Sequence, residues 1–241
     1  MPKAVKRASK AKPRAKAEST VSLKPVQRSA KQEFLVSDAI SFGFDTTLHR
    51  FGLIFGVSLL LGVIFGLIPV VLDAIWKNAD GAVAVLALVV RIALWIFEIF
   101  VSLGAVLLMI KIARGAGEFR DLLACFDVVL AVRYVVAAIL YGLIVLGGLI
   151  LFIIPGIIWA IQFRFYALLI VDKKLGPIEA LKASSRMTRG VKWQLLGLVI
   201  VLFLIQILGF LALIVGLFVT VPLAELAVIY VYEKLLPKAD L

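Results

Sequence analysis

The sequence predicts an all-α, polytopic integral membrane protein with six transmembrane helices arranged as three hairpins. Apolar side chains make up 63% of its 241 residues and the mean hydropathy is +1.11, which is more apolar surface than one soluble core can bury. One block recurs three times, over residues 37–113, 118–172 and 177–236. Each block contains a short amphipathic stretch, a long apolar run, a break and a second apolar run. The basic residues also gather at one end of these blocks.

The first element is a basic tail over residues 1–36, which we expect to be disordered. Its first 34 residues hold ten Lys and Arg against two Glu, so +8 of the net charge of +11 lies there. Almost no apolar side chain in the tail is available for burial. Because no apolar stretch follows the charges within 35 residues, a cleaved secretory signal is not expected, and an organelle transit peptide is the alternative.

Six apolar runs are expected to cross the membrane, which takes roughly 20 helical residues for about 30 Å of hydrocarbon. They are residues 51–74, 82–110, 134–154, 157–171 and 193–213, and a sixth run that follows Gly216 and Pro222 and ends near Tyr232. The run 82–110 would be roughly 43 Å long, so we expect it to tilt or to project from the bilayer. In the first run, Gly52-x-x-x-Gly56 and Gly62-x-x-x-Gly66 predict close packing of a neighbouring helix.

The orientation follows from the loops. The tail, the link 111–133 and the link 172–192 are rich in Lys and Arg, whereas Lys77 is the only basic residue in the opposite connections. The positive-inside rule therefore predicts that both termini, including the short C-terminal segment 237–241, lie in the cytoplasm.

Each hairpin is preceded by a stretch that we expect to form a short cytoplasmic amphipathic helix. The first opens with Ser37-Asp38, and the second places apolar residues at 119, 122, 123 and 126. In the third, Gly176-Pro177 is typical of a helix start and Gly190 of a helix end. Its basic stripe is the candidate binding site for anionic headgroups of the cytoplasmic leaflet. The stripe consists of Lys182, Arg186 and Arg189. Alternatively, these helices pack on the ends of the bundle as connectors.

Four ionisable residues fall inside the apolar runs, namely Arg91, Glu98, Arg164 and Glu225. A charge at the centre of a membrane helix costs roughly 2.5–3.5 kcal/mol, so we expect these residues to face protein and to pair. The preferred pairs are Glu98 with Arg164 and Arg91 with Glu225. Two interpretations stay open: a polar pathway or headgroup-binding cavity, and two structural ion pairs that fix helix order.

A set of residues between 155 and 197 resembles a known family. It comprises Pro155-Gly156-Ile157, Arg164, Ile170-Val171-Asp172, Gly176-Pro177-Ile178-Glu179-Ala180-Leu181-Lys182-Ala183-Ser184, Met187-Thr188-Arg189-Gly190 and Trp193-Gln194-Leu195-Leu196-Gly197. The chain is similar here to uncharacterised bacterial inner-membrane proteins of the YciC-like group. It is also similar to the membrane domain that precedes some glycerophosphoryl diester phosphodiesterases. The resemblance is good over residues 150–235 and looser over 37–150.

The resemblance implies a helical domain of a bacterial inner (cytoplasmic) membrane, without an established activity. The family's Arg corresponds to Arg164 and its acidic position to Asp172, with no role attached to either. The sequence contains no soluble barrel of roughly 250 residues and no His, Glu and Asp cluster of the kind that the phosphodiesterase part uses. Enzymatic activity of that kind is therefore not expected.

The sequence favours a non-enzymatic membrane scaffold or a domain that interacts with lipid or protein. The alternative is a small transporter or channel that uses the four charges at membrane depth. The single Cys125 excludes an intrachain disulfide, and the lone His49 has no second His beside it, so neither a metal nor another cofactor is expected. The expected partners are the bilayer, anionic headgroups and possible copies of the chain or other proteins, while nucleic acid is not favoured.

Overall fold

The computed structural model describes residues 34–78, 80–124, 126–212 and 216–239. Within these ranges the regular secondary structure is helical and no strand occurs, which confirms the all-α part of the predicted fold class. The predicted tail lies outside the described residues except for its last three positions, and so do the last two residues of the chain.

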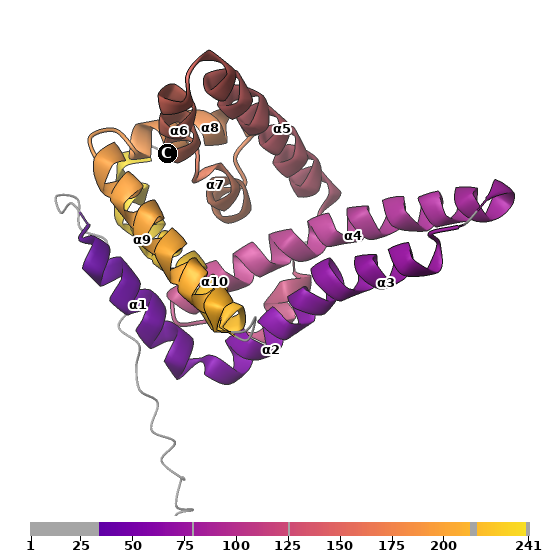
Figure 1. The fold of residues 1–241 in the computed structure, drawn as a ribbon. Helices are drawn as coiled ribbons and strands as arrows, with labels where there is room; N and C mark the ends of the chain where they lie inside the picture. Colours follow the sequence, from indigo (N-terminus) through magenta and orange to yellow (C-terminus); the bar gives the residue numbers. More distant parts are fainter. Residues whose placement is uncertain (1–33, 79, 125, 213–215, 240–241) are drawn as a thin grey trace, which may run out of the picture.

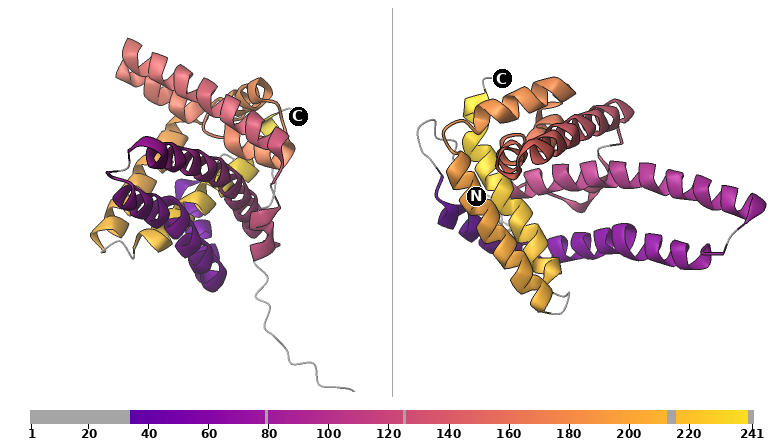
Figure 2. Two further views of the ribbon diagram at one scale, coloured as in Figure 1. Left: turned by 90° about the vertical axis from the view of Figure 1, so that its right-hand side faces the viewer. Right: turned by 45° about the horizontal axis from the view of Figure 1, so that its top comes forward.

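The first apolar run forms one nearly continuous helical segment. It comprises α2 (Phe51–Gly62), the π-helical turn η1 (Val63–Leu67) and α3 (Ile68–Ile75). It returns through the 33-residue helix α4 (Gly81–Ala113). Figures 1 and 2 show α3 and the N-terminal half of α4 reaching away from the other helices.

In the second block, the sequence pattern predicted one continuous helix where the structure has two. Asp127 caps α5 (Val128–Leu151) by accepting a hydrogen bond from the backbone N–H of Val129 at 2.9 Å. The chain then reverses into α6 (Ile153–Gln162), which packs against α5, and turns again into α7 (Tyr166–Lys173). The predicted run 157–171 is therefore two short helices with a break at residues 163–165.

The third block consists of α8 (Pro177–Met187), α9 (Lys192–Leu211) and α10 (Leu217–Leu235), followed by the 3-10 turn η3 (Leu236–Ala239). Pro177 begins α8, the side chain of Glu179 accepts a hydrogen bond from the Gly176 backbone N–H at 3.1 Å, and Gly190 follows the helix with φ +84°. These bounds confirm the punctuation that the sequence indicated.

Within the described ranges, five helical segments are long and apolar enough to cross a membrane. They are Phe51–Ile75, Gly81–Ala113, Val128–Leu151, Ile153–Lys173 and Lys192–Leu211. The sixth predicted span corresponds to α10, which carries Glu225, Glu233 and Lys234 and is not one of these five. The structure thus supports a membrane-embedded protein, in which α10 differs from the other long helices by its many buried residues.

The three amphipathic stretches differ from one another. The first forms α1 (Val36–His49), which packs on α10 through small residues such as Ala39 and Gly43, so that Phe44 and Leu48 are exposed. The second is only the 3-10 turn η2 (Phe119–Leu123), because Asp127 starts α5 soon afterwards. The third, α8, turns its apolar face onto α5 and α7.

Most glycines in the Gly-x-x-x-Gly motifs of the first apolar run do not lie at close helix contacts, contrary to the prediction. A Cβ added to Gly52, Gly56 or Gly66 would meet nothing within 4 Å, so three of the four glycines in the predicted packing motifs face open space. The close approaches lie elsewhere: a Cβ on Gly104 would collide with the backbone carbonyl of Leu122. Tight packing thus occurs where α4 meets η2, and also where α1 meets α10, because a Cβ on Gly43 would lie 2.6 Å from the Leu223 carbonyl oxygen.

Candidate functional site

The four charges at membrane depth are grouped differently from the predicted pairs. Arg91 of α4 forms an ion pair with Asp73 of the neighbouring α3. Arg164 is exposed in the turn between α6 and α7, and it lies close enough to Glu225 of α10 to interact with it electrostatically. Sequence spacing sets the depth of a residue in a span but not the direction in which its helix turns it. The predicted pairs rested on depth alone, which explains why the structure groups these charges differently.

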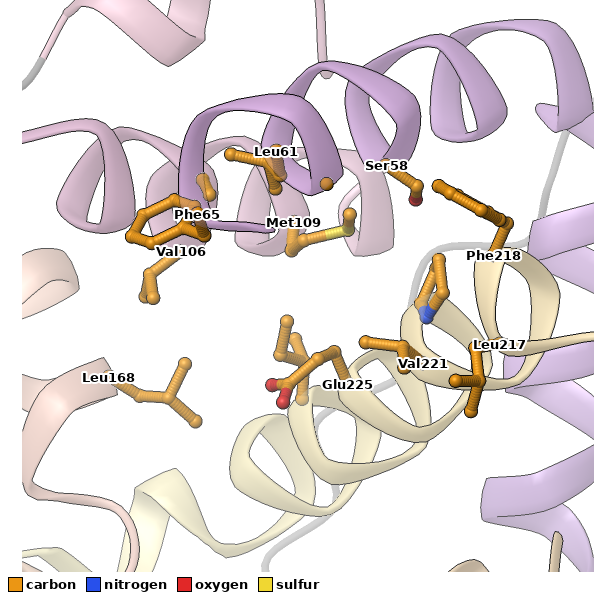
Figure 3. A pocket seen from close by; sticks show the side chains of 14 residues that line it. Ser58, Leu61, Phe65, Val106, Met109, Leu168, Leu217, Phe218, Val221 and Glu225 are labelled. Atoms are coloured by element: carbon orange, nitrogen blue, oxygen red, sulfur yellow. The ribbon is translucent and has the colours of Figure 1, made fainter. Parts of the chain in front are cut away.

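Glu225 lies in a cavity of about 570 Å³ between four helical segments. Segments from α2 with η1, from α4, from α7 and from α10 form its wall (Figure 3). The lining residues are Ser58, Leu61, Gly62, Phe65, Ala105, Val106, Met109, Leu168, Leu217, Phe218, Val221, Pro222, Glu225 and Ile229. Glu225 is the single ionisable residue among them. This size and this mostly apolar lining are typical of sites for small molecules.

Two of the helices that line the cavity are irregular at the cavity itself. The π-helical turn η1 contains Phe65, and α10 contains Pro222 in its interior, where the ring removes a backbone donor. Pi-helical turns inside longer helices occur frequently at functional sites. Both irregularities therefore agree with a site at this position.

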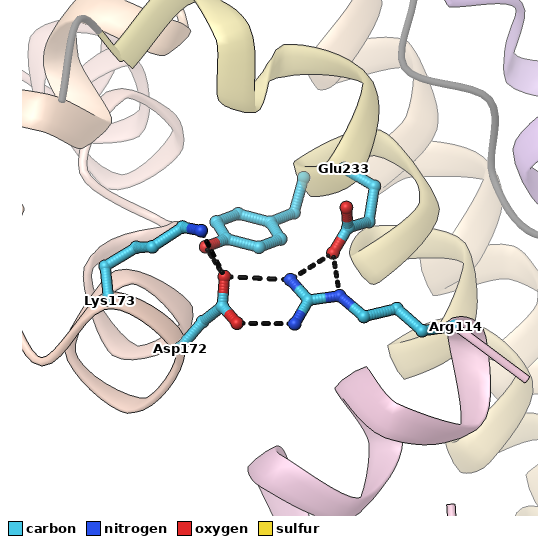
Figure 4. A network of polar contacts seen from close by, with 5 residues as sticks. Arg114, Asp172, Lys173 and Glu233 are labelled. Carbon is cyan, nitrogen blue, oxygen red and sulfur yellow. Dashed lines mark hydrogen bonds and ion pairs between the residues drawn. The ribbon is translucent and has the colours of Figure 1, made fainter. Parts of the chain in front are cut away.

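A buried ionic network joins the helices that surround the cavity (Figure 4). Arg114, which follows the last residue of α4, donates two hydrogen bonds to the carboxylate of Asp172 of α7, at 2.6 and 2.8 Å. The same guanidinium donates through Nε to Glu233 Oε1 of α10 at 2.8 Å. The hydroxyl of Tyr232 donates to Asp172 at 2.9 Å, and Lys173 Nζ lies 3.5 Å from the same carboxylate. The hydrogen bonds to Asp172 are the largest cause that raises the pKa of Arg114 above its usual value.

The network lies about one helical turn beyond the cavity on each helix. Met109 of α4 precedes Arg114, Leu168 of α7 precedes Asp172, and Ile229 of α10 precedes Glu233. The side chains of Asp172 and Glu233 are only 6% and 2% exposed, and Arg114, which contacts both, offsets part of the cost of burying their charges. The network therefore fixes three walls of the cavity relative to one another.

The break between α6 and α7 is stabilised by α8. The hydroxyl of Ser184 donates to the backbone carbonyl of Gln162 at 2.9 Å and accepts from the backbone N–H of Phe165 at 3.2 Å. Thr188 donates to the same carbonyl at 3.2 Å. Backbone groups that the break removes from the helix thus gain partners, as buried polar groups require.

The three residues of the predicted headgroup stripe on α8 do not behave alike: one binds the C-terminal turn and two are exposed. Arg186 donates through Nε to the carbonyl of Ala239 at 2.9 Å and holds the C-terminal turn η3 against α8. Lys182 and Arg189 are exposed. Two of the three basic side chains are therefore available to a headgroup.

Sequence reasoning missed the roles of Arg114, Tyr232 and Glu233. Arg114 was counted only as a loop charge, and Asp172 entered only through the family resemblance. The sequence does contain a signal for this network. A charged residue lies at the end of an apolar run in each of the three blocks, and the three ends are all predicted on the cytoplasmic side. Opposite charges at these ends predict a shared network.

Neither metal-binding residues nor similar proteins identify a function for this site. Within the described ranges, no group of three or more His, Cys, Asp or Glu residues is placed to hold a metal ion. Comparisons with protein-family models, with curated proteins and with solved structures gave no match.

Proposed function

We propose that this protein is a non-enzymatic, multi-pass membrane protein that binds a lipid-like ligand in the Glu225 cavity. The lining of the cavity is the main support for this proposal, because its wall is apolar apart from Ser58 and Glu225. A ligand with an apolar body and one polar group matches this lining. The resemblance of residues 150–235 to membrane domains of the YciC-like group agrees with a role that needs no catalytic residues.

The ligand proposal is tested by retention of phospholipid. Full-length protein is extracted from membranes of phosphatidylethanolamine and phosphatidylglycerol, and bound lipid is counted by native mass spectrometry. Val106→Trp places a large side chain in the cavity, whereas Val89→Trp adds the same side chain at an exposed position of the same helix. We expect Val106→Trp to retain fewer lipid molecules per protein than wild type and Val89→Trp, because its tryptophan fills only the Glu225 cavity. Equal retention by all three folded proteins would show that lipid binds elsewhere.

We further propose six crossings with both termini in the cytoplasm of a bacterium. In this arrangement α10 is the sixth span, and pairing of Glu233 with Arg114 offsets part of the cost of its charge. The exposed Lys182 and Arg189 then face the anionic inner leaflet, at about 1 kcal/mol per basic residue near the surface. Single-cysteine labelling at Lys77 and Lys182 tests this topology in a background without Cys125. Labelling of both positions from one side would contradict it.

Transport is the second candidate, because the candidate span Ile153–Lys173 is broken beside Arg164. Discontinuous membrane helices form substrate and ion sites in many transporters, and Arg164 lies within electrostatic range of Glu225, which lines the cavity. Proton flux in proteoliposomes tests this function. Flux that Glu225→Gln and Arg164→Gln abolish without unfolding the protein would favour transport. A wild-type protein without flux would leave lipid binding as the supported function.

A further inference from the structure

A second pocket lies between α3 and the first half of α4, on different helix segments from the Glu225 cavity. It has a volume of about 250 Å³ and is lined by Pro69, Leu72, Asp73, Trp76, Arg91, Leu94, Trp95 and Glu98. An adjoining hollow of about 340 Å³ shares Asp73, Trp76 and Arg91 and adds Lys77. The two hollows form one groove, which we call the α3–α4 groove.

The groove carries two positive and two negative side chains. Lys77 and Arg91 are the cations, and Asp73 and Glu98 are the anions. Arg91 and Asp73 form an ion pair with each other, but Glu98 has neither a hydrogen bond nor an ion pair within the part of the chain that the structure describes. A carboxylate in an apolar helix without a partner is costly, so a cationic ligand group beside Glu98 would be stabilised there.

Two tryptophans line the same pocket. Trp76 follows the last residue of α3, and Trp95 lies one turn before Glu98 on α4, with 58% of its surface exposed. The face of an indole ring attracts ammonium groups, and aromatic residues around a carboxylate are a known means of binding them. The pocket thus combines two features that favour an organic ammonium ion.

We propose that the α3–α4 groove binds the zwitterionic headgroup of a phospholipid. The ammonium group lies against Glu98 and the two tryptophans, and the phosphate lies toward Lys77 and Arg91. The balanced charge of the groove matches a zwitterion better than an anion. Exposed apolar side chains beside the groove, such as Ile92 and Ile96, provide a surface for the acyl chains. Membrane embedding is required for this proposal, but lipid binding in the Glu225 cavity is not.

The test compares headgroups on identical acyl chains. Full-length protein in detergent is titrated with dioleoyl phosphatidylethanolamine, dioleoyl phosphatidylcholine and dioleoyl phosphatidylglycerol, and binding is followed by native mass spectrometry. We expect the two zwitterionic lipids to bind about tenfold more tightly than phosphatidylglycerol, since cation–π and ion-pair contacts of this kind are worth about one factor of ten. Equal binding of all three lipids would overturn the proposal.

Three variants assign the preference to the groove. Glu98→Gln removes the carboxylate and Trp95→Leu removes an exposed ring, so both are expected to abolish the tenfold preference. Glu118→Gln changes an exposed carboxylate outside the groove and should retain it. A preference that survives both groove variants would contradict the assignment. Val106→Trp should also keep the preference, because it fills only the Glu225 cavity. Its loss there would place the headgroup in that cavity instead.

The source of the headgroup is tested with soluble O-phosphoethanolamine. Because the acyl chains contribute contacts that the soluble compound lacks, we expect it to compete with the lipid only at concentrations at least about a hundredfold higher. Competition at equal concentration would overturn the lipid part of the proposal.

Discussion

Arg114 and Arg91 show how differently the two ends of α4 are used. Arg114 pairs with carboxylates that are 6% and 2% exposed and that come from α7 and α10. Arg91 pairs with Asp73 of the adjacent α3, and these two side chains are 61% and 57% exposed. The first arginine holds distant parts of the chain together, whereas the second leaves an open groove. The same residue type is thus a structural centre at one end and part of a candidate binding site at the other.

The largest expected effect is the loss of Arg114. Arg114→Gln removes the guanidinium that the buried carboxylates of Asp172 and Glu233 share, and we expect a loss of about 3–5 kcal/mol in unfolding free energy. Equilibrium unfolding in mixed micelles measures this loss. Arg91→Gln is the matched control, for which we expect roughly 0–1 kcal/mol because its pair is exposed. Equal losses would remove the distinction between the two ends.

A smaller loss is expected at the close contact between α4 and η2. A Cβ at Gly104 would collide with the Leu122 carbonyl, so Gly104→Ala should cost about 1–3 kcal/mol through displacement of η2. Gly56→Ala faces open space and gains helix propensity, so it should leave stability unchanged or raise it. Thermal unfolding followed by circular dichroism compares the two variants. A stable Gly104→Ala protein would show that this contact is not tight.

The helix break next to Arg164 should depend on Ser184. Ser184→Ala leaves the Phe165 backbone N–H without its acceptor, which we expect to cost about 1–2 kcal/mol. Amide hydrogen exchange of residues 163–166 should increase in this variant. Ser41→Ala removes an exposed hydroxyl from α1 and serves as the control, with an expected effect within about 0.5 kcal/mol. Unchanged exchange near the break would mean that α8 does not stabilise it.

The smallest effect concerns pH. Lys111 donates a hydrogen bond to Asp121 at 2.6 Å, and this contact is the main cause that lowers the pKa of Asp121 below its usual 3.8. The contribution of Asp121 to stability is therefore present above pH 3.8 and is lost as the pH falls further below that value. Melting temperatures of wild type and Asp121→Asn between pH 5 and 2.5 measure it. The wild type should lose more stability than the variant, and parallel curves would contradict the role of this pair.

Hydropathy predicted the helical class and the long apolar segments well, because it depends on averages over about 20 residues. The same averaging concealed the break at residues 163–165, where only a few positions leave the helix. The π-helical turn over Val63–Leu67 has no distinct composition either, since every residue in it is apolar or Gly. Local irregularities of this kind depend on tertiary contacts that a window average does not contain.

The candidate residues were found more readily than their partners. The sequence identified Glu98, Arg91, Arg164 and Glu225 as unusual because charges are rare in apolar runs. Their grouping depends on helix rotation and on which helices are neighbours, so Asp73 was missed as the partner of Arg91. Glu233 was missed because it lies near the end of a run, where a charge is not unusual in itself. Residue type thus indicated the candidate positions, and the packing decided their contacts.

The Arg114 network joins α4 to α7 and α10 and thereby holds the first helix pair against the rest of the chain in one arrangement. Electron–electron distance measurement between spin labels at Lys77, near the end of α3, and Leu211, the last residue of α9, tests this claim directly in a background without Cys125. We expect one narrow distance distribution in wild type and in Arg91→Gln, and a broad or shifted one in Arg114→Gln. An equally narrow and unshifted distribution in Arg114→Gln would contradict the claim.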